Sequence, residues 1–155
     1  MSFRVTPIPA AISEEARRTQ RSPGFHGHLI QIHVATAKGY GPCRSCLRRT
    51  REGERRLFMS YNPYPEAEQV PVVGPIYIHE DPCEPFAGPG FPDELRGLPM
   101  VLRGHYQDGS TIVNVKLGDQ SPEAAIETLF QDDRIAYIAI QNPEAACFIA
   151  RVERA

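Results

Sequence analysis

The sequence predicts a single α+β domain, residues 1–155, in which a mixed, mostly antiparallel sheet packs against one or two helices. Three observations favour this class. Short stretches alternate apolar and polar residues with the period of a strand, two stretches begin with residues typical of a helix N-terminus, and Asp108-Gly109 joins two strands as in a hairpin. No internal repeat or low-complexity tail divides the chain.

The first elements lie before residue 36. Residues 2–9 alternate and contain two prolines, which cannot donate to a ladder, so they predict an edge strand. Ser13, followed by two glutamates, is expected to begin a helix that ends before Ser22-Pro23-Gly24. Residues 28–35 alternate again and predict a strand with one buried face. The residues expected on that face are Ile30, Ile32 and Val34.

The later elements follow the same reasoning. Ser121, with Pro122 behind it, predicts a second helix, and the stretch that follows, 134–141, is apolar on both faces, as in a central strand. The prolines and glycines of 82–92 indicate a loop without regular structure, followed by a helical turn at 92–95. The other expected strands are residues 57–61, 72–79, 98–106, 110–117 and 147–153.

Composition limits the function classes. With 41% apolar and 23% charged residues the chain is an ordinary globular protein, and a net charge of −2 argues against general affinity for nucleic acid or membranes. We find neither a signal peptide nor a transmembrane stretch and expect a cytoplasmic protein, a monomer or small homo-oligomer, whose partner is a small anionic molecule or a specific protein. In a reducing compartment its four cysteines are expected to be thiols or ligands.

Reactive side chains gather between Gly39 and Cys83. This stretch holds three of the four cysteines, and between positions 44 and 56 it carries six arginines against two glutamates. Such a positive segment in a net negative chain indicates a site for an anion, or else a solvated turn. These arginines are Arg44, Arg48, Arg49, Arg51, Arg55 and Arg56.

Several phrases of the chain resemble the bacterial family called domain of unknown function 1203. They are MSFRVTPIP, PCRSCLRR with the following EGERRLFMSYNP, GPIYIHEDPCEP, LFQDDRIAYIAIQN and ACFIARVERA, and they extend over nearly the whole chain. The resemblance implies a small bacterial cytoplasmic protein. It implies no reaction and no functional residue.

A zinc site is one interpretation of the central stretch. Cys43 and Cys46 have a spacing that lets two thiolates reach one tetrahedral ion, and His79 with Cys83 can supply the second pair. The second pair has an irregular spacing, and Leu47 stands where zinc knuckles usually have glycine. The alternative for Cys43 and Cys46 is thiol redox chemistry, for which nearby arginines are favourable, although the surrounding sequence does not predict the strand and helix that such sites need.

Anion binding without covalent chemistry is the interpretation that we favour for the same stretch. Arginines can clamp a carboxylate or phosphate, while tyrosine and histidine on neighbouring strands donate hydrogen bonds. The expected ligand-binding residues are Arg44, Arg48, Arg56, Tyr61, Tyr77 and His79. Nucleic acid is a poorer partner, because only Tyr61 and Tyr64 offer rings for stacking.

Two further features are open. His105 and Tyr106, opposite Asp108, are either an acid/base pair or residues that bond a turn. Cys147 is either a half-buried small residue or another partner of the central cysteines.

Overall fold

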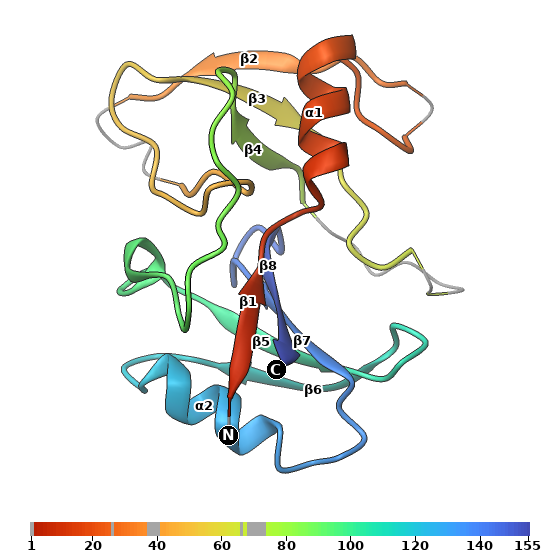
Figure 1. Ribbon diagram of the computed structural model, residues 1–155, viewed down its shortest axis with the longest axis vertical. Coiled ribbons are helices and arrows are strands. Elements are labelled where there is room, and N and C mark those ends of the chain that lie inside the picture. The colour runs from red at the N-terminus through yellow and green to blue at the C-terminus, as the bar shows by residue number, and fades with distance from the viewer. Residues whose placement is uncertain (1, 26, 37–40, 66, 68–73) are drawn as a thin grey trace.

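The structure is a computed structural model that describes residues 2–25, 27–36, 41–65, 67 and 74–155. Within these residues the chain forms two α-helices, one short 3-10 helix and eight strands (Figure 1). In chain order these elements are β1 (Phe3–Thr6), α1 (Ala10–Thr19), β2 (Gln31–Val34), β3 (Arg55–Met59), β4 (Ile76–His79), η1 (Asp93–Leu95), β5 (Val101–His105), β6 (Thr111–Lys116), α2 (Pro122–Leu129), β7 (Tyr137–Gln141) and β8 (Phe148–Arg154).

Five strands form one antiparallel sheet in the order β1-β8-β7-β5-β6. Every residue of β7 is buried, as expected for a central strand, and β5 and β6 are consecutive in the chain and paired as the Asp108-Gly109 signal predicts. Helix α2 begins where predicted, because Ser121 Oγ accepts a hydrogen bond from Ala124 N at 3.3 Å. Its buried Ile126 and Leu129 belong to the same apolar core as Leu102, Ile138 and Ile140 of the sheet.

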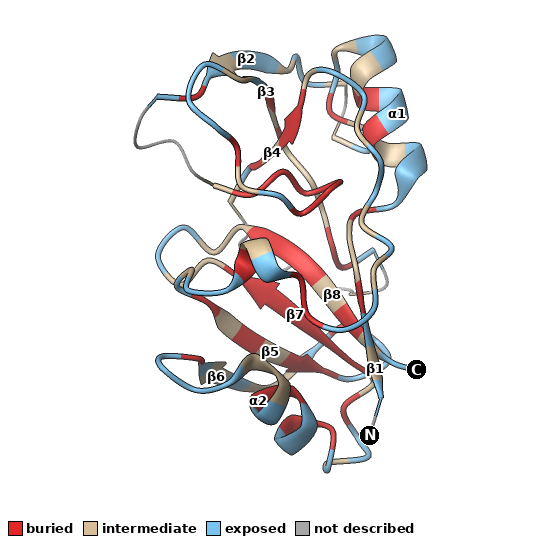
Figure 2. Cartoon of the chain, turned by 60° about the vertical axis from the view of Figure 1, so that its left-hand side comes forward, coloured by how far each residue is buried: buried red, intermediate tan, exposed pale blue. Residues whose placement is uncertain are grey.

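The other three strands form a smaller antiparallel sheet in the order β2-β3-β4. Figure 1 shows this sheet and α1 at one end of the molecule, and the larger sheet with α2 at the other. A second core lies under the small sheet, and it includes Leu57, Ile76 and Ile78 together with Tyr137 and Phe148 from the larger sheet. The two sheets therefore share buried contacts, and Figure 2 shows the buried residues concentrated where they meet and along β7 and β8.

The α+β class is confirmed, with the strands divided between two antiparallel sheets where one was expected. Helix α1 begins at Ala10, so the predicted start at Ser13 is wrong: the Ser13 hydroxyl lies inside the helix and donates to Ala10 O. The buried face predicted for β2 is also wrong, because Ile32 is 43% and Val34 53% exposed. His33 is half-buried, and its ring stacks on Phe58 of the neighbouring strand.

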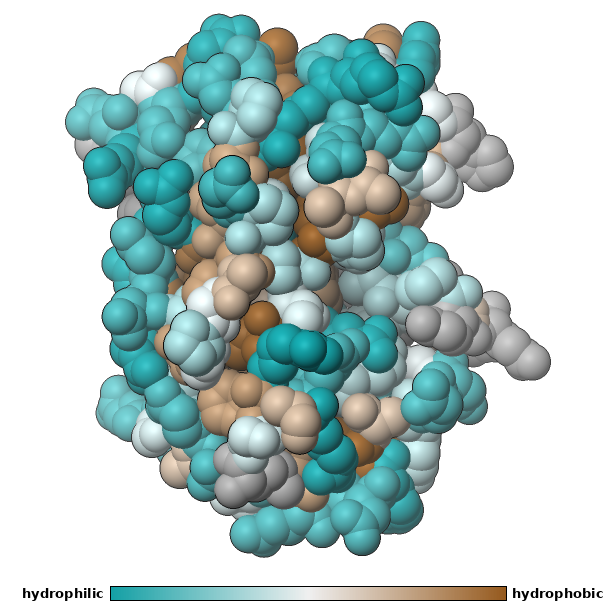
Figure 3. Space-filling model, in the orientation of Figure 1, coloured by the Kyte–Doolittle hydropathy of each residue, from teal (hydrophilic) through white to brown (hydrophobic). Residues whose placement is uncertain are grey.

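The surface is mainly hydrophilic at its margins in the orientation of Figure 1, and apolar residues gather toward the middle of that face (Figure 3). Among the described residues, no helix is long and apolar enough to cross a membrane.

Candidate metal centre

The first two cysteines lie in a tight turn stabilised by backbone hydrogen bonds. Leu47 N donates to Cys43 O at 2.8 Å, and Cys43 N donates to Arg48 O at 2.9 Å. This turn requires a left-handed residue just after Cys46, and Leu47 adopts it with φ of 59°. A non-glycine residue pays about 1–2 kcal/mol for that conformation. The missing glycine therefore does not prevent the turn from forming, because Leu47 takes its place.

The second pair of ligands comes from the end of β4. His79 is the last residue of this strand and pairs with Arg56 of β3, and Cys83 follows four residues later. A hydrogen bond from Phe86 N to Ser45 O, 2.9 Å, holds the segment after Cys83 against the cysteine turn. The fold thus brings together two segments about 40 residues apart.

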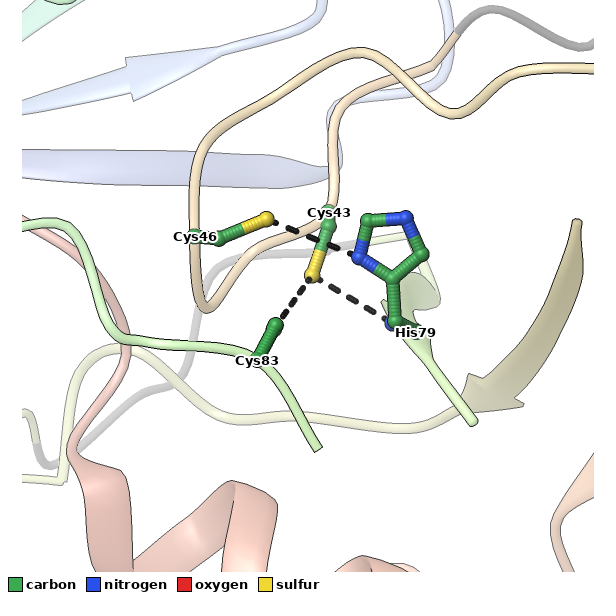
Figure 4. A group of neighbouring side chains, drawn as sticks. All are labelled: Cys43, Cys46, His79 and Cys83. Carbon is green, nitrogen blue, oxygen red and sulfur yellow. Dashed lines mark hydrogen bonds between the residues drawn. The ribbon is translucent and has the colours of Figure 1, made fainter. Parts of the chain in front are cut away.

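The four side chains converge as the zinc interpretation requires (Figure 4). The three Sγ atoms and a ring nitrogen of His79 all lie within 4.8 Å of one another. Cys43 Sγ is 3.9 Å from Cys83 Sγ, and Cys46 Sγ is 3.5 Å from His79 Nδ1. Around a tetrahedral zinc ion the corresponding separations are about 3.8 Å for two sulfurs and about 3.5 Å for a sulfur and a nitrogen, from bonds of about 2.3 and 2.0 Å. This Cys3His cluster can hold a metal ion.

Two residues outside the predicted set orient these ligands. Glu54 Oε2 lies 2.8 Å from His79 Nε2, which leaves Nδ1 directed at the sulfurs. Arg17 of α1 donates to Cys83 Sγ at 3.3 Å and to His79 O at 3.1 Å. A carboxylate behind a ligating histidine is the usual arrangement in metal sites. Sequence reasoning missed both residues, because nothing in their local pattern indicates which side chain they meet.

Hydrogen bonds within the cluster shift the pKa values of its ligands in different directions. Hydrogen bonds from Cys43 and Cys46 hold the pKa of the Cys83 thiol far below its usual range. Hydrogen bonds with the Cys46 and Cys83 sulfurs raise the pKa of His79 to about 10, against the opposite effect of burial. The hydrogen bond that Cys46 makes with Cys43 raises the pKa of the Cys46 thiol. Binding of a dication therefore requires loss of the His79 proton and of the Cys46 thiol proton, so metal affinity should rise with pH.

The cluster is buried on most sides and open on one. Cys43, Cys46 and His79 are buried and Cys83 is half-buried. His79 and Cys83 line a cleft of about 270 Å³. The cleft gives an ion a route to the ligands. Its other walls are Arg48, Gly53, Glu54, Arg55, Asp81 and Pro82.

The structure distributes the six expected anion-binding residues over several places. Arg48 and His79 line the cleft beside the cysteines, whereas Arg44 and Tyr77 line a different pocket between the two sheets. The Arg56 guanidinium lies 4.0 Å above the Tyr77 ring, and the Tyr61 ring packs against Phe148. Only part of the predicted set can therefore meet one ligand. The alternative of a solvated turn also holds only in part, because Arg44 and Arg56 are buried.

The remaining alternatives are less well supported by the geometry. Cys43 and Cys46 lie in a turn bridged by Pro42 and Arg49, and in the described part of the chain neither cysteine is in the first turn of a helix, where a redox thiol is commonly activated. His105 Nδ1 bonds Gly109 O at 2.8 Å, which is the role of a turn residue. Cys147 is not a member of the Cys3His cluster.

Comparisons with known proteins give one match. A family model described as "Protein of unknown function (DUF1203)" matches residues 40–154, which include all four cluster residues. No curated protein and no solved structure matches the chain.

Proposed function

Since the chain belongs to the DUF1203 family of proteins of unknown function, we propose a function from the site itself: the protein binds one zinc ion through Cys43, Cys46, His79 and Cys83. The observation that carries this proposal is the convergence of three sulfurs and one imidazole nitrogen within 4.8 Å. Cysteines that are buried only as apolar side chains are not expected to surround one histidine nitrogen at the separations of a tetrahedral ligand shell.

The donor set favours zinc over other ions. Three thiolates and one imidazole are soft and borderline ligands, which exclude calcium and magnesium as natural occupants and suit a tetrahedral zinc ion. Zinc with three thiolates leaves a single negative charge. Arg17, which donates to Cys83 Sγ, compensates for it, and an interaction with the Cys46 sulfur raises the pKa of Arg48.

The proposed role of the ion is structural. Four protein ligands complete the coordination of zinc and leave no position for a substrate, which distinguishes structural from catalytic sites. The ion fastens the cysteine turn to the end of β4 and, through Arg17, to α1. The small sheet offers only three short strands, so a metal crosslink supplies stability that its limited core does not.

Zinc content and thiol reactivity of the same sample test the proposal. We expect one zinc per chain after purification without added metal, and one reactive thiol, Cys147, of four. Chelation should expose all four. Cys83→Ser should lose the zinc, and Cys147→Ser, the matched control, should keep it. Absence of zinc after reconstitution with the metal, or equal zinc loss in the two variants, rules the site out.

A further inference from the structure

A second pocket lies between the two sheets, apart from the four proposed zinc ligands. It has a volume of about 470 Å³, within the range of small-molecule sites. Its walls are mainly apolar and come from both sheets and the segments beside them. They include Phe58 and Tyr77 of the small sheet, Leu98 and Pro99 before β5, and Ile149 of β8.

One buried cation lines this apolar pocket. The Arg44 side chain is 4% exposed, and its guanidinium is held by two backbone carbonyls: Nε donates to Phe148 O at 2.7 Å and Nη1 to Pro42 O at 2.5 Å. These hydrogen bonds fix the guanidinium in position, but the carbonyl acceptors carry no net negative charge.

A second buried arginine lies beside this pocket. Arg56 is 8% exposed, and its guanidinium stacks on the ring of Tyr77, which lines the pocket. Neither Arg44 nor Arg56 forms an ion pair with a carboxylate of the described residues. Buried charges in proteins are normally paired, so the buried Arg44 in the wall of this apolar pocket, with no carboxylate partner, indicates a binding position for an anion.

We propose that this pocket binds a small organic acid, whose carboxylate pairs with Arg44 and whose apolar body lies against Phe58, Tyr77, Leu98 and Ile149. Glu144 also lines the pocket, but it is exposed, so water screens its repulsion of the acid. The carboxylate at Arg44 meets a less polar environment, in which the attraction is stronger. An inorganic anion would occupy only the region at Arg44 and leave the apolar walls in contact with water. An acid with an apolar body therefore fits the pocket better.

Cys147 provides a chemical reporter inside the pocket. Cys147 is half-buried and lines the same pocket as Arg44. A ligand in the pocket should therefore shield Cys147 from alkylation. Peptide mapping by mass spectrometry separates Cys147 from the other three cysteines, so the test does not depend on whether zinc protects them, and zinc content is measured separately.

The experiment compares iodoacetamide alkylation of Cys147 with benzoate and with benzyl alcohol, which has the same ring without the charge. At saturation, benzoate should slow the alkylation of Cys147 at least about tenfold. Benzyl alcohol cannot form the charge-assisted pair with Arg44, so its concentration for half-protection should be about tenfold higher than that of benzoate. No protection by benzoate up to tens of millimolar, or equal protection by the two compounds, overturns the proposal.

Variants locate the carboxylate. Arg44→Met should raise the benzoate concentration for half-protection about tenfold, whereas Arg51→Met, the same change at an exposed arginine of the same segment, should leave it unchanged. If Arg44→Met does not fold, Leu98→Trp, which fills the pocket from a partly exposed position, should abolish protection in folded protein. Unchanged benzoate protection in the folded variant overturns the site.

Discussion

Leu47 shows two opposing effects at one residue. Its φ of 59° is unfavourable for a branched side chain. However, Leu47 is only 1% exposed and belongs to the apolar core between the larger sheet and α2. Left-handed strain costs about 1–2 kcal/mol, whereas removing a buried leucine costs about 2–5 kcal/mol. Packing therefore outweighs strain, which explains why leucine is tolerated where a zinc knuckle usually has glycine.

Leu47→Gly tests this balance. The variant should be less stable by roughly 1–3 kcal/mol, because relief of strain is smaller than the loss of buried surface. Urea unfolding of the zinc-loaded protein measures the difference, and zinc stoichiometry should stay at one because no ligand changes. Equal or higher stability of the glycine variant would show that strain dominates.

Glu54 is the second residue with a specific expected effect. Replacing it with alanine removes the carboxylate beside His79 Nε2, so zinc affinity should fall about 10- to 100-fold. Competition with a chromophoric chelator gives the affinity. Glu52→Ala changes an exposed glutamate of the same turn and should have no effect. A similar small effect in both variants would mean that Glu54 does not orient the histidine.

At the scale of elements, local patterns predicted some features and failed for others. The cap at Ser121 and the fully buried strand at residues 137–141 were predicted correctly. Both features depend on residues that are adjacent in the sequence. The alternation in β2 was correctly recognised, but the face expected to be buried is largely exposed at Ile32 and Val34. Which face of an edge strand is covered depends on residues distant in sequence, here Phe58 and Tyr77, which contact His33.

The candidate site divides in the same way. The spacing of Cys43 and Cys46, and of His79 and Cys83, was sufficient to group them as ligands. Arg17 lies on a helix more than 60 residues from Cys83, so no local signal connects the two. The anion set failed to stay together for a related reason: neighbours on a strand or turn point to opposite sides, and Arg44 and Arg48 line different pockets.

Helix α2 has an ion pair near its N-terminus with a predictable pH dependence. Hydrogen bonds from Arg96 lower the pKa of Glu123 to about 2, from an ordinary value of 4.5. A depressed folded-state pKa contributes stability above the unfolded value, and this contribution is lost as pH falls from about 4.5 toward 2. Because both side chains are more than a third exposed, solvent screening limits the contribution to less than about 1 kcal/mol.

Glu123→Gln should remove this part of the acid sensitivity. The stability difference between wild type and variant, measured by urea unfolding, should be largest at pH 5 and shrink toward pH 2.5. Asp119→Asn, at a neighbouring acidic position for which the structure gives no ion pair among the described residues, serves as the control. A difference that does not vary with pH would contradict the assignment.

At the scale of the molecule, the two sheets differ in what supports them. The larger sheet has α2 and its own apolar core, whereas the smaller sheet is closed by the Cys3His cluster, whose Cys43 and Cys46 are part of the second core. Removal of the metal should therefore loosen the two ends unequally.

Hydrogen exchange before and after chelation should show this inequality. Amides of residues 43–47 and of β4 should exchange at least about tenfold faster without zinc, while those of β7 and β8 change less, because stability varies among parts of one fold. Readdition of zinc provides the control for irreversible damage. A uniform change throughout both sheets would show that the molecule unfolds as one unit.

The position of Arg44 in the chain has one more consequence. It stands between Cys43 and Cys46, so the residue proposed to bind the acid is covalently fixed within the loop proposed to bind the ion. Any coupling that this shared loop creates between the two ligands is reciprocal. The factor by which zinc changes the affinity for benzoate equals the factor by which benzoate changes the affinity for zinc. Measuring the affinity for one ligand with and without the other therefore determines both effects.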